Sequence, residues 1–165
     1  RVLKKFGVAR TPDEIERKTH ELLDLVKLPR EFANRKPRQL SGGQKQRIGI
    51  ARALAADPEL IICDEVTSAL DQIVQEGILK LLLKLQKETN VSYLFITHDI
   101  ATVRAISDEI VVMHQGKVVQ QGPKTKVLNP PYPAYTELLL SSVPEMDPDW
   151  LTNLLAKRAK GKVKA

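Results

Sequence analysis

Short apolar runs alternate with helical segments along most of this chain, and this alternation most constrains how it can fold. Strands are predicted at 60–63, 93–96, 109–113 and 117–121, and helices between them at 73–86 and 100–106. Strands that are apolar at successive positions are buried on both faces, which is typical of a parallel sheet covered by helices. The sequence therefore predicts an α/β fold with a parallel sheet and flanking helices.

Two helices are predicted before the first of these strands. One spans about 12–27, because Thr11 is a good N-cap and Glu14 follows it at the spacing of a capping box. The segment 29–38 carries two prolines and mixed charge, so we expect a loop there. The second helix spans about 41–55.

Polar residues follow two of the predicted strands at the point where each strand ends. Asp64 and Glu65 come directly after 60–63, and His98 lies just beyond 93–96. In open parallel sheets, ligands bind outside the carboxyl ends of the strands. Carboxylates there can hold a hydrated magnesium ion and polarise a water, and a histidine can donate a hydrogen bond to a phosphate oxygen. The alternative is that one acid only caps the next helix, since acids are common at helix starts.

A glycine-rich stretch, LSGGQ at 40–44, begins the predicted helix 41–55. It supplies the hydroxyl of Ser41 and the glycines Gly42 and Gly43, but no acidic side chain. Glycines leave backbone N–H groups exposed at the positive end of the helix dipole, where an anion such as phosphate is favoured. Taken by itself, this stretch is weak evidence for a phosphate site.

The sequence LSGGQKQRIGIARALAADPELIICDE, followed by TSALD and THD, resembles the ATP-binding cassette (ABC) family of ATPases. LSGGQ is similar to the family's signature motif, LIICDE to its Walker B strand, SALD at 68–71 to its D-loop, and His98 to its switch histidine. Any one of these motifs has a substantial false-positive risk, whereas all four occur in the family's order and spacing across 39–99. The resemblance implies an α/β fold of the P-loop NTPase type.

The resemblance also implies a role for each matching residue. Asp64 helps to hold magnesium, Glu65 acts as general base on the attacking water, and His98 contacts the terminal phosphate of ATP. In this family two cassettes enclose two ATP molecules, so each site is shared between them. The residues that serve the partner's ATP are Ser41, Gly42, Gly43 and Gln44, which bind its terminal phosphate, with 44–47 extending that surface, and Asp71, which joins the opposing site.

One part of the family's site is absent from these 165 residues. The cradle for ATP phosphates is a glycine-rich loop followed by Lys and then Ser or Thr, and no Gly-Lys-Ser or Gly-Lys-Thr occurs here. The resemblance therefore implies the C-terminal part of a cassette, without the Walker A region and without one central strand between 93–96 and 109–113. We expect the sheet to be incomplete without the N-terminal part, and the chain to be inactive alone.

On this interpretation the chain divides into three parts. Residues 1–38 are the end of a helical subdomain, 39–128 are the C-terminal part of the ATPase core, and 129–165 are an extension with a basic tail. The extension, with a short helix predicted at 134–140, resembles the one found on ATP-binding subunits of dipeptide and oligopeptide importers. The resemblance implies ATP and Mg²⁺ as cofactors, a second ATP-binding cassette and integral membrane permease subunits as partners, and a cytoplasmic position on the inner face of the cell membrane.

Two other classes of function are compatible with parts of the sequence. A catalytically silent binding or regulatory module of the same fold agrees with the missing phosphate loop, although the presence of Glu65 and His98 argues against lost catalysis. A non-transport ABC ATPase would typically continue into long heptad-patterned coiled coils, and the 165 residues contain none.

Composition argues against a nucleic-acid partner and against a membrane span. The net charge is +6, but five basic residues and no acidic ones follow Trp150, so the positive charge belongs mainly to a tail that we expect to be solvated. That tail has no aromatic side chain to stack on a base. No apolar stretch approaches the roughly 20 residues that span a bilayer. Cys63 is the single cysteine, which excludes an intrachain disulfide.

Overall fold

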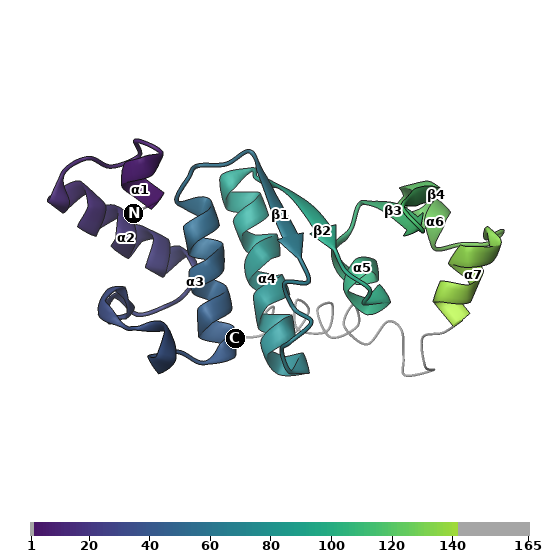
Figure 1. Ribbon diagram of the computed structural model, residues 1–165, viewed down its shortest axis with the longest axis horizontal. Helices are drawn as coiled ribbons and strands as arrows, with labels where there is room; N and C mark the ends of the chain where they lie inside the picture. Colours follow the sequence, from purple (N-terminus) through teal and green to yellow (C-terminus); the bar gives the residue numbers. More distant parts are fainter. Residues whose placement is uncertain (1, 142–165) are drawn as a thin grey trace, which may run out of the picture. The chain divides into compact units, whose positions relative to one another are not determined.

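The computed structural model of the protein describes residues 2–141, which divide into two compact units between Ile96 and Thr97 (Figure 1). The first unit contains helices α1 (Val2–Lys5), α2 (Pro12–Leu25), α3 (Gly42–Leu54) and α4 (Gln72–Thr89), short 3₁₀ helices at Arg30–Asn34 and Pro37–Gln39, and strands β1 (Leu60–Asp64) and β2 (Ser92–Ile96). The second contains α5 (Ile100–Ile106), β3 (Glu109–His114), β4 (Lys117–Pro123), α6 (Lys124–Val127) and α7 (Ala134–Ser141). The predicted basic tail lies outside the described residues.

Helix α2 begins with the capping box that its sequence predicts. The Thr11 hydroxyl accepts a hydrogen bond from the Glu14 N–H at 3.3 Å, and the Glu14 carboxylate accepts one from the Thr11 N–H at 3.1 Å. The backbone N–H groups of Arg10 and Thr11, which both donate to the Glu14 carboxylate, hold the pKa of Glu14 below its ordinary value. The helix ends at Leu25, earlier than predicted, because Lys27 adopts a left-handed backbone conformation with φ of 57°.

The predicted loop 29–38 contains more regular structure than its sequence suggests. Two short 3₁₀ helices occupy most of it, and Phe32 in the first of them is buried in the core. The Arg35 guanidinium lies over the Phe32 ring at 3.9 Å from its centroid. Proline fixes its own φ near the helical value, so a proline-containing segment can still start a 3₁₀ turn.

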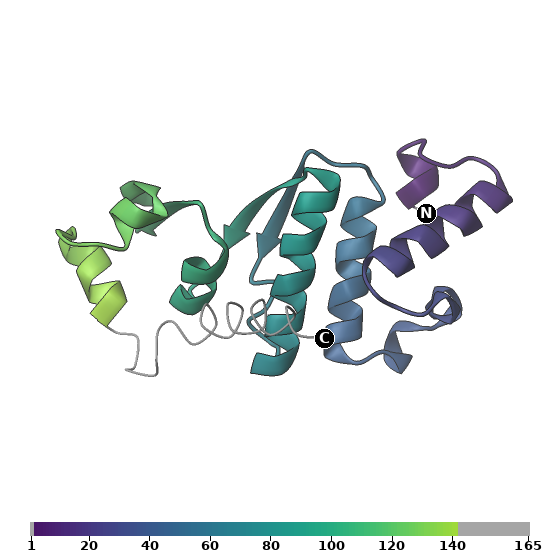
Figure 2. The ribbon, with the colours of Figure 1, turned by 180° about the vertical axis from the view of Figure 1, so that it is seen from behind.

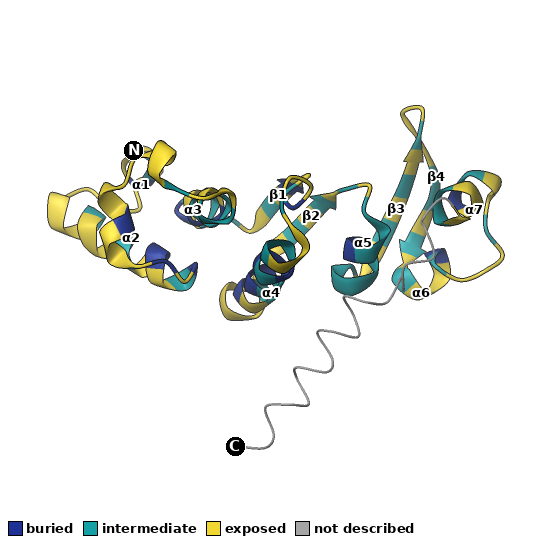
Figure 3. Cartoon of the chain, turned by 90° about the horizontal axis from the view of Figure 1, so that it is seen from below, coloured by how far each residue is buried: buried dark blue, intermediate teal, exposed yellow. Residues whose placement is uncertain are grey.

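The core of the first unit lies where α3 and α4 pack together, and α2 adds to it (Figures 1 and 2). Helix α4 carries large apolar residues at helical spacing, and these form one face that is dark blue in Figure 3. The buried residues of this face are Ile78, Leu79, Leu81, Leu82 and Leu85. No helix in the described part of the chain is long and apolar enough to cross a membrane.

The strands pair in two separate sheets within the described residues. Strands β1 and β2 are parallel, in register from Leu60 opposite Ser92 to Asp64 opposite Ile96. Strands β3 and β4 form an antiparallel hairpin with an irregularity between Val112 and Met113. The predicted parallel sheet is therefore confirmed for the first pair, and each of the two sheets has two strands among the described residues.

The prediction that these strands are buried on both faces is wrong for the described chain. One face of the β1–β2 sheet packs against the helical core through Tyr93 and Phe95, and Cys63, the register partner of Phe95, is also buried. The other face is about half exposed, from 48% at Ile96 to 62% at Ile62. A strand becomes buried on both faces only when a second layer covers it, and the described residues of the first unit supply helices on one face only.

The second unit is held together by the hairpin and α7. The ring of His114, the last residue of β3, stacks on that of Tyr135 with centroids 3.9 Å apart. This contact fixes α7 against the hairpin. Strand β3 extends to His114, one residue beyond the predicted strand 109–113.

We expect Leu85→Ala to lower the free energy of unfolding by about 2–5 kcal/mol, because its side chain is fully buried and the cavity cannot fill completely. Lys87→Ala, at an exposed position of the same helix, should change it by less than about 0.5 kcal/mol. Urea denaturation followed by circular dichroism measures both. Similar losses for the two variants would contradict the assignment of the core.

Candidate functional site

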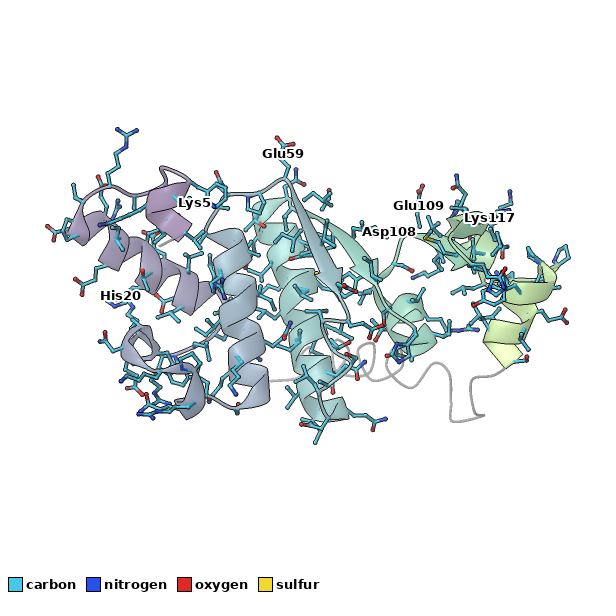
Figure 4. The ribbon with its side chains drawn as sticks, in the orientation of Figure 1. Lys5, His20, Glu59, Asp108, Glu109 and Lys117 are labelled. Atoms are coloured by element: carbon cyan, nitrogen blue, oxygen red, sulfur yellow. The ribbon has the colours of Figure 1, made fainter. Side chains whose placement is uncertain are left out.

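The carboxyl ends of β1 and β2 meet at one edge of the parallel sheet. Asp64 is the last residue of β1 and is exposed, and its register partner on β2 is Ile96. The next residue, Glu65, donates its backbone N–H to the Ile96 carbonyl at 2.9 Å. Glu59, labelled in Figure 4, precedes the opposite end of β1. The predicted acid pair therefore lies at the edge of the sheet where ligands bind in open α/β folds.

Glu65 has a left-handed backbone conformation, with φ of 47°. Such a conformation is uncommon for a residue other than glycine and costs of order 1–3 kcal/mol, so it persists only where neighbouring groups hold it. Here its N–H is bonded to Ile96, and its carbonyl accepts from the backbone N–H of Ser68 at 3.3 Å and from the Ser68 hydroxyl at 3.0 Å. Strain of this kind concentrates at functional positions.

Asp71 caps the helix that follows the acid pair. Its carboxylate accepts a hydrogen bond from the Val74 N–H at 3.0 Å, and α4 begins at the next residue. The alternative that Asp64 or Glu65 caps this helix is therefore wrong, because Asp71 takes that role. The two acids are left at the strand end, separated from the helix by the turns of the D-loop.

The LSGGQ stretch forms the start of α3 with a second capping box. The Ser41 hydroxyl accepts from the Gln44 N–H at 3.3 Å, and the Gln44 side-chain oxygen accepts from the Ser41 N–H at 2.9 Å. Gly42 and Gly43 occupy the first two helical positions, and no acidic side chain lies in this turn. The N-terminal turn of a helix leaves N–H groups without partners inside the helix, which favours an anion there.

Arg47, further along α3, has a different position from the one expected. Its guanidinium donates a hydrogen bond to the carbonyl of Val26 at 2.9 Å. Val26 is the C-cap of α2, where a positive charge is favourable at the negative end of the helix dipole. The expectation that the stretch 44–47 extends the phosphate-binding surface as far as Arg47 is therefore not supported, because this side chain joins α3 to α2.

His98 belongs to the second unit and lies in the turn between β2 and α5. The N–H of the next residue, Asp99, donates to the Thr97 hydroxyl at 3.1 Å. The Asp99 carboxylate then caps α5, accepting from the Ala101 N–H at 3.0 Å and from the hydroxyl of Thr102, which is fully buried. These bonds anchor the segment that carries His98.

The acid pair has the chemistry expected of a magnesium site that is completed by a nucleotide. Mg²⁺ prefers oxygen ligands and is commonly held by one or two carboxylates together with water and substrate phosphates. Within the described residues, no cluster of three or more His, Cys, Asp or Glu side chains could hold a metal. The exposed carboxylate of Asp64 at the strand end fits an ion that is bound together with substrate phosphates.

Parallel strands with flanking helices and strand-end acids are typical of α/β folds that bind nucleotides. The sequence profile of the ABC transporter family matches residues 3–68. The oligopeptide transport ATP-binding protein OppF of Bacillus subtilis is 48% identical over 151 residues, which cover 92% of this chain and 50% of that protein. The dipeptide transport ATP-binding protein DppF of Lactococcus lactis is 46% identical over 142 residues, covering 86% and 46%.

Solved structures show the same relationship. The cassette cbiO1 of Clostridium perfringens, part of the ABC transporter complex cbiONQ, superimposes with a TM-score of 0.65 and 35% identity, covering 77% of this chain and 51% of that one. The ATP-binding cassette MJ0796, a dimer bound to ADP and Pi in a post-hydrolysis state, superimposes with a TM-score of 0.60 and 40% identity, covering 70% and 49%.

Residues 3–68 thus match the ABC transporter family, and the chain is similar to part of the ATP-binding proteins and cassettes of its members. The predicted α/β fold of the P-loop NTPase type is confirmed by these neighbours. The chain spans about half the length of the curated relatives that it matches.

Cys63 precedes the acid pair on β1, and its burial raises the pKa of its thiol from 9.0 to about 11. The thiolate is the reactive form, so at pH 8 we expect iodoacetamide to label the folded protein slowly and the urea-unfolded protein rapidly. Because the folded pKa is the higher one, the neutral thiol favours folding below pH 9.0, and this contribution is lost as the pH rises through about 11. Mass spectrometry measures the labelling, and equal rates would contradict the burial of Cys63.

Proposed function

We propose that the protein is the ATP-binding and ATP-hydrolysing subunit of an ABC importer for dipeptides or oligopeptides. The observation that carries this proposal is the strand-end pair Asp64 and Glu65, with Glu65 held in a strained backbone conformation by the end of β2 and by Ser68. The resemblance to oligopeptide and dipeptide transport ATP-binding proteins supports the choice of solute class.

In this proposal three residues of the chain have distinct roles in ATP hydrolysis. Asp64 helps to hold the magnesium ion that accompanies ATP, and the ion supplies charge neutralisation at the phosphates. Glu65 orients the attacking water and accepts its proton. His98 donates a hydrogen bond to an oxygen of the terminal phosphate, where negative charge is concentrated.

A second group of residues serves an ATP molecule that is held mainly by another cassette. The N–H groups of Gly42 and Gly43 and the hydroxyl of Ser41 lie at the positive end of α3, and they bind the terminal phosphate of that ATP. Gln44 supports this turn through its bond to the Ser41 N–H, and Asp71 reaches the same opposing site. ATP-driven closure of the two cassettes then moves integral membrane permease subunits, which place the protein on the inner face of the cell membrane.

We expect Glu65→Gln, in the complete subunit that carries this chain, to lower ATP turnover by about 100-fold or more while ATP binding is retained, because a general base contributes about 10²–10⁴-fold. Glu59→Gln removes the same charge at the opposite end of β1 and should leave turnover unchanged. Phosphate release and equilibrium nucleotide binding are measured for both variants. Turnover that survives Glu65→Gln would overturn the catalytic assignment.

We also expect the 165-residue chain alone to show no magnesium-dependent ATP turnover, because its sequence contains no Gly-Lys-Ser or Gly-Lys-Thr phosphate loop. Activity should appear only when a complete cassette partner is added, and it should then fall when Ser41 is replaced by Ala. A phosphate-release assay with and without the partner measures this. Turnover by the chain alone that depends on Glu65 would mean that other residues of this chain cradle the phosphates.

A further inference from the structure

Val74, in the first turn of α4, contacts two motifs through different atoms. Its backbone N–H donates to the Asp71 carboxylate in the D-loop at 3.0 Å. Its side chain lies against Gly43 in the signature stretch, so that a Cβ added at Gly43 would be only 2.6 Å from the Val74 Cγ1. One residue therefore joins the start of α3 to the start of α4.

Gly43 has no room for a side chain. A Cβ built there would lie 2.6 Å from the Val74 Cγ1, well below van der Waals contact, and the Val74 side chain cannot swing away easily, because β-branched residues have one strongly preferred rotamer in a helix. The neighbouring contact is ordinary, since a Cβ at Gly42 would be 3.6 Å from the Leu70 Cδ2. Gly43 is therefore required by the packing of α4, independently of any bound phosphate.

The surroundings of this contact are themselves packed. Val66, Leu70 and Val74 are partly buried and lie against the hydrophobic core of the first unit, which includes Ile50 and Ala51 of α3. Close-packed interiors transmit displacement instead of absorbing it. The N-terminal turn of α3 and the cap of α4 are thus fixed to each other through Val74.

We propose that Val74 is a positioning residue that sets the signature N–H groups and the Asp71 carboxylate at one fixed separation. Both motifs then meet the partner cassette's ATP as a single rigid element. The inference rests on the proposed function, and Val74 itself does not touch the nucleotide. Misplacement of a binding group by about 1 Å can cost about 100-fold in rate, so the separation of the two motifs matters for turnover.

The test uses the complete subunit that carries this chain, assembled with its partner cassette. Val74→Ala removes both γ-carbons but keeps the backbone bond to Asp71, and Val74→Thr keeps the branched shape. Ile78→Val removes one methyl group from a fully buried position of the same helix, away from the two motifs, and serves as the control for general loss of packing.

Each variant is measured in two backgrounds that isolate one ATP site at a time. With Glu65→Gln in the same subunit, the remaining turnover occurs at the partner's ATP, which the signature stretch and D-loop of this chain serve. There we expect Val74→Ala to lower turnover about 10- to 100-fold, with Val74→Thr and Ile78→Val within about 2-fold of their parent. With the partner's catalytic glutamate replaced instead, Val74→Ala should have an effect below about 2-fold. Equal losses in the two backgrounds would overturn the proposal.

Hydrogen exchange of backbone amides gives a readout that needs no activity. Val74→Ala should speed exchange at 41–45 and 70–75 together, and Ile78→Val should not. Unchanged exchange at 41–45 would also overturn the proposal. Failure of the proposed function would give a different result: Glu65→Gln as a single substitution would leave ATP turnover intact. Hydrogen exchange would still test the contact between Val74 and Gly43 in that case.

Discussion

The parallel pairing of β1 with β2 is the constraint on which the described site depends. Parallel neighbours cannot be joined by a tight turn, so the chain must cross over the sheet, and α4 makes that crossing. The same helix buries its apolar face against the sheet and α3, and its first turn carries the Asp71 cap. Helix α4 consequently links the strand pairing, the core and the D-loop. A displacement of this helix would therefore affect all three.

Local signals predicted most of the elements. The capping box at Thr11 and Glu14, the start of α3 at Ser41, and the strands around 60–63 and 93–96 were recognisable because each depends on residues close in sequence. The strand-end position of Asp64 and Glu65 was predictable for the same reason, once the order of strands and helices indicated a parallel sheet.

The features that the sequence did not predict all depend on distant partners. The left-handed conformation of Glu65 needs the carbonyl of Ile96, and the position of Arg47 needs the C-terminus of α2. The close approach of Gly43 to Val74 joins the starts of two helices. The exposure of one sheet face likewise could not be read from the apolar strands, since burial depends on what covers a surface and not on its composition alone.

The half-exposed face of the β1–β2 sheet affects how readily the chain associates with other chains. Leu60, Ile62, Leu94 and Ile96 present adjacent apolar side chains on a sheet of only two strands, so each strand also has an edge without a sheet partner among the described residues. Apolar surface beside unpaired strand edges favours association with other chains. A chain in which this face stays uncovered is therefore more prone to association, and to recognition by chaperones and proteases, than one in which the face is covered.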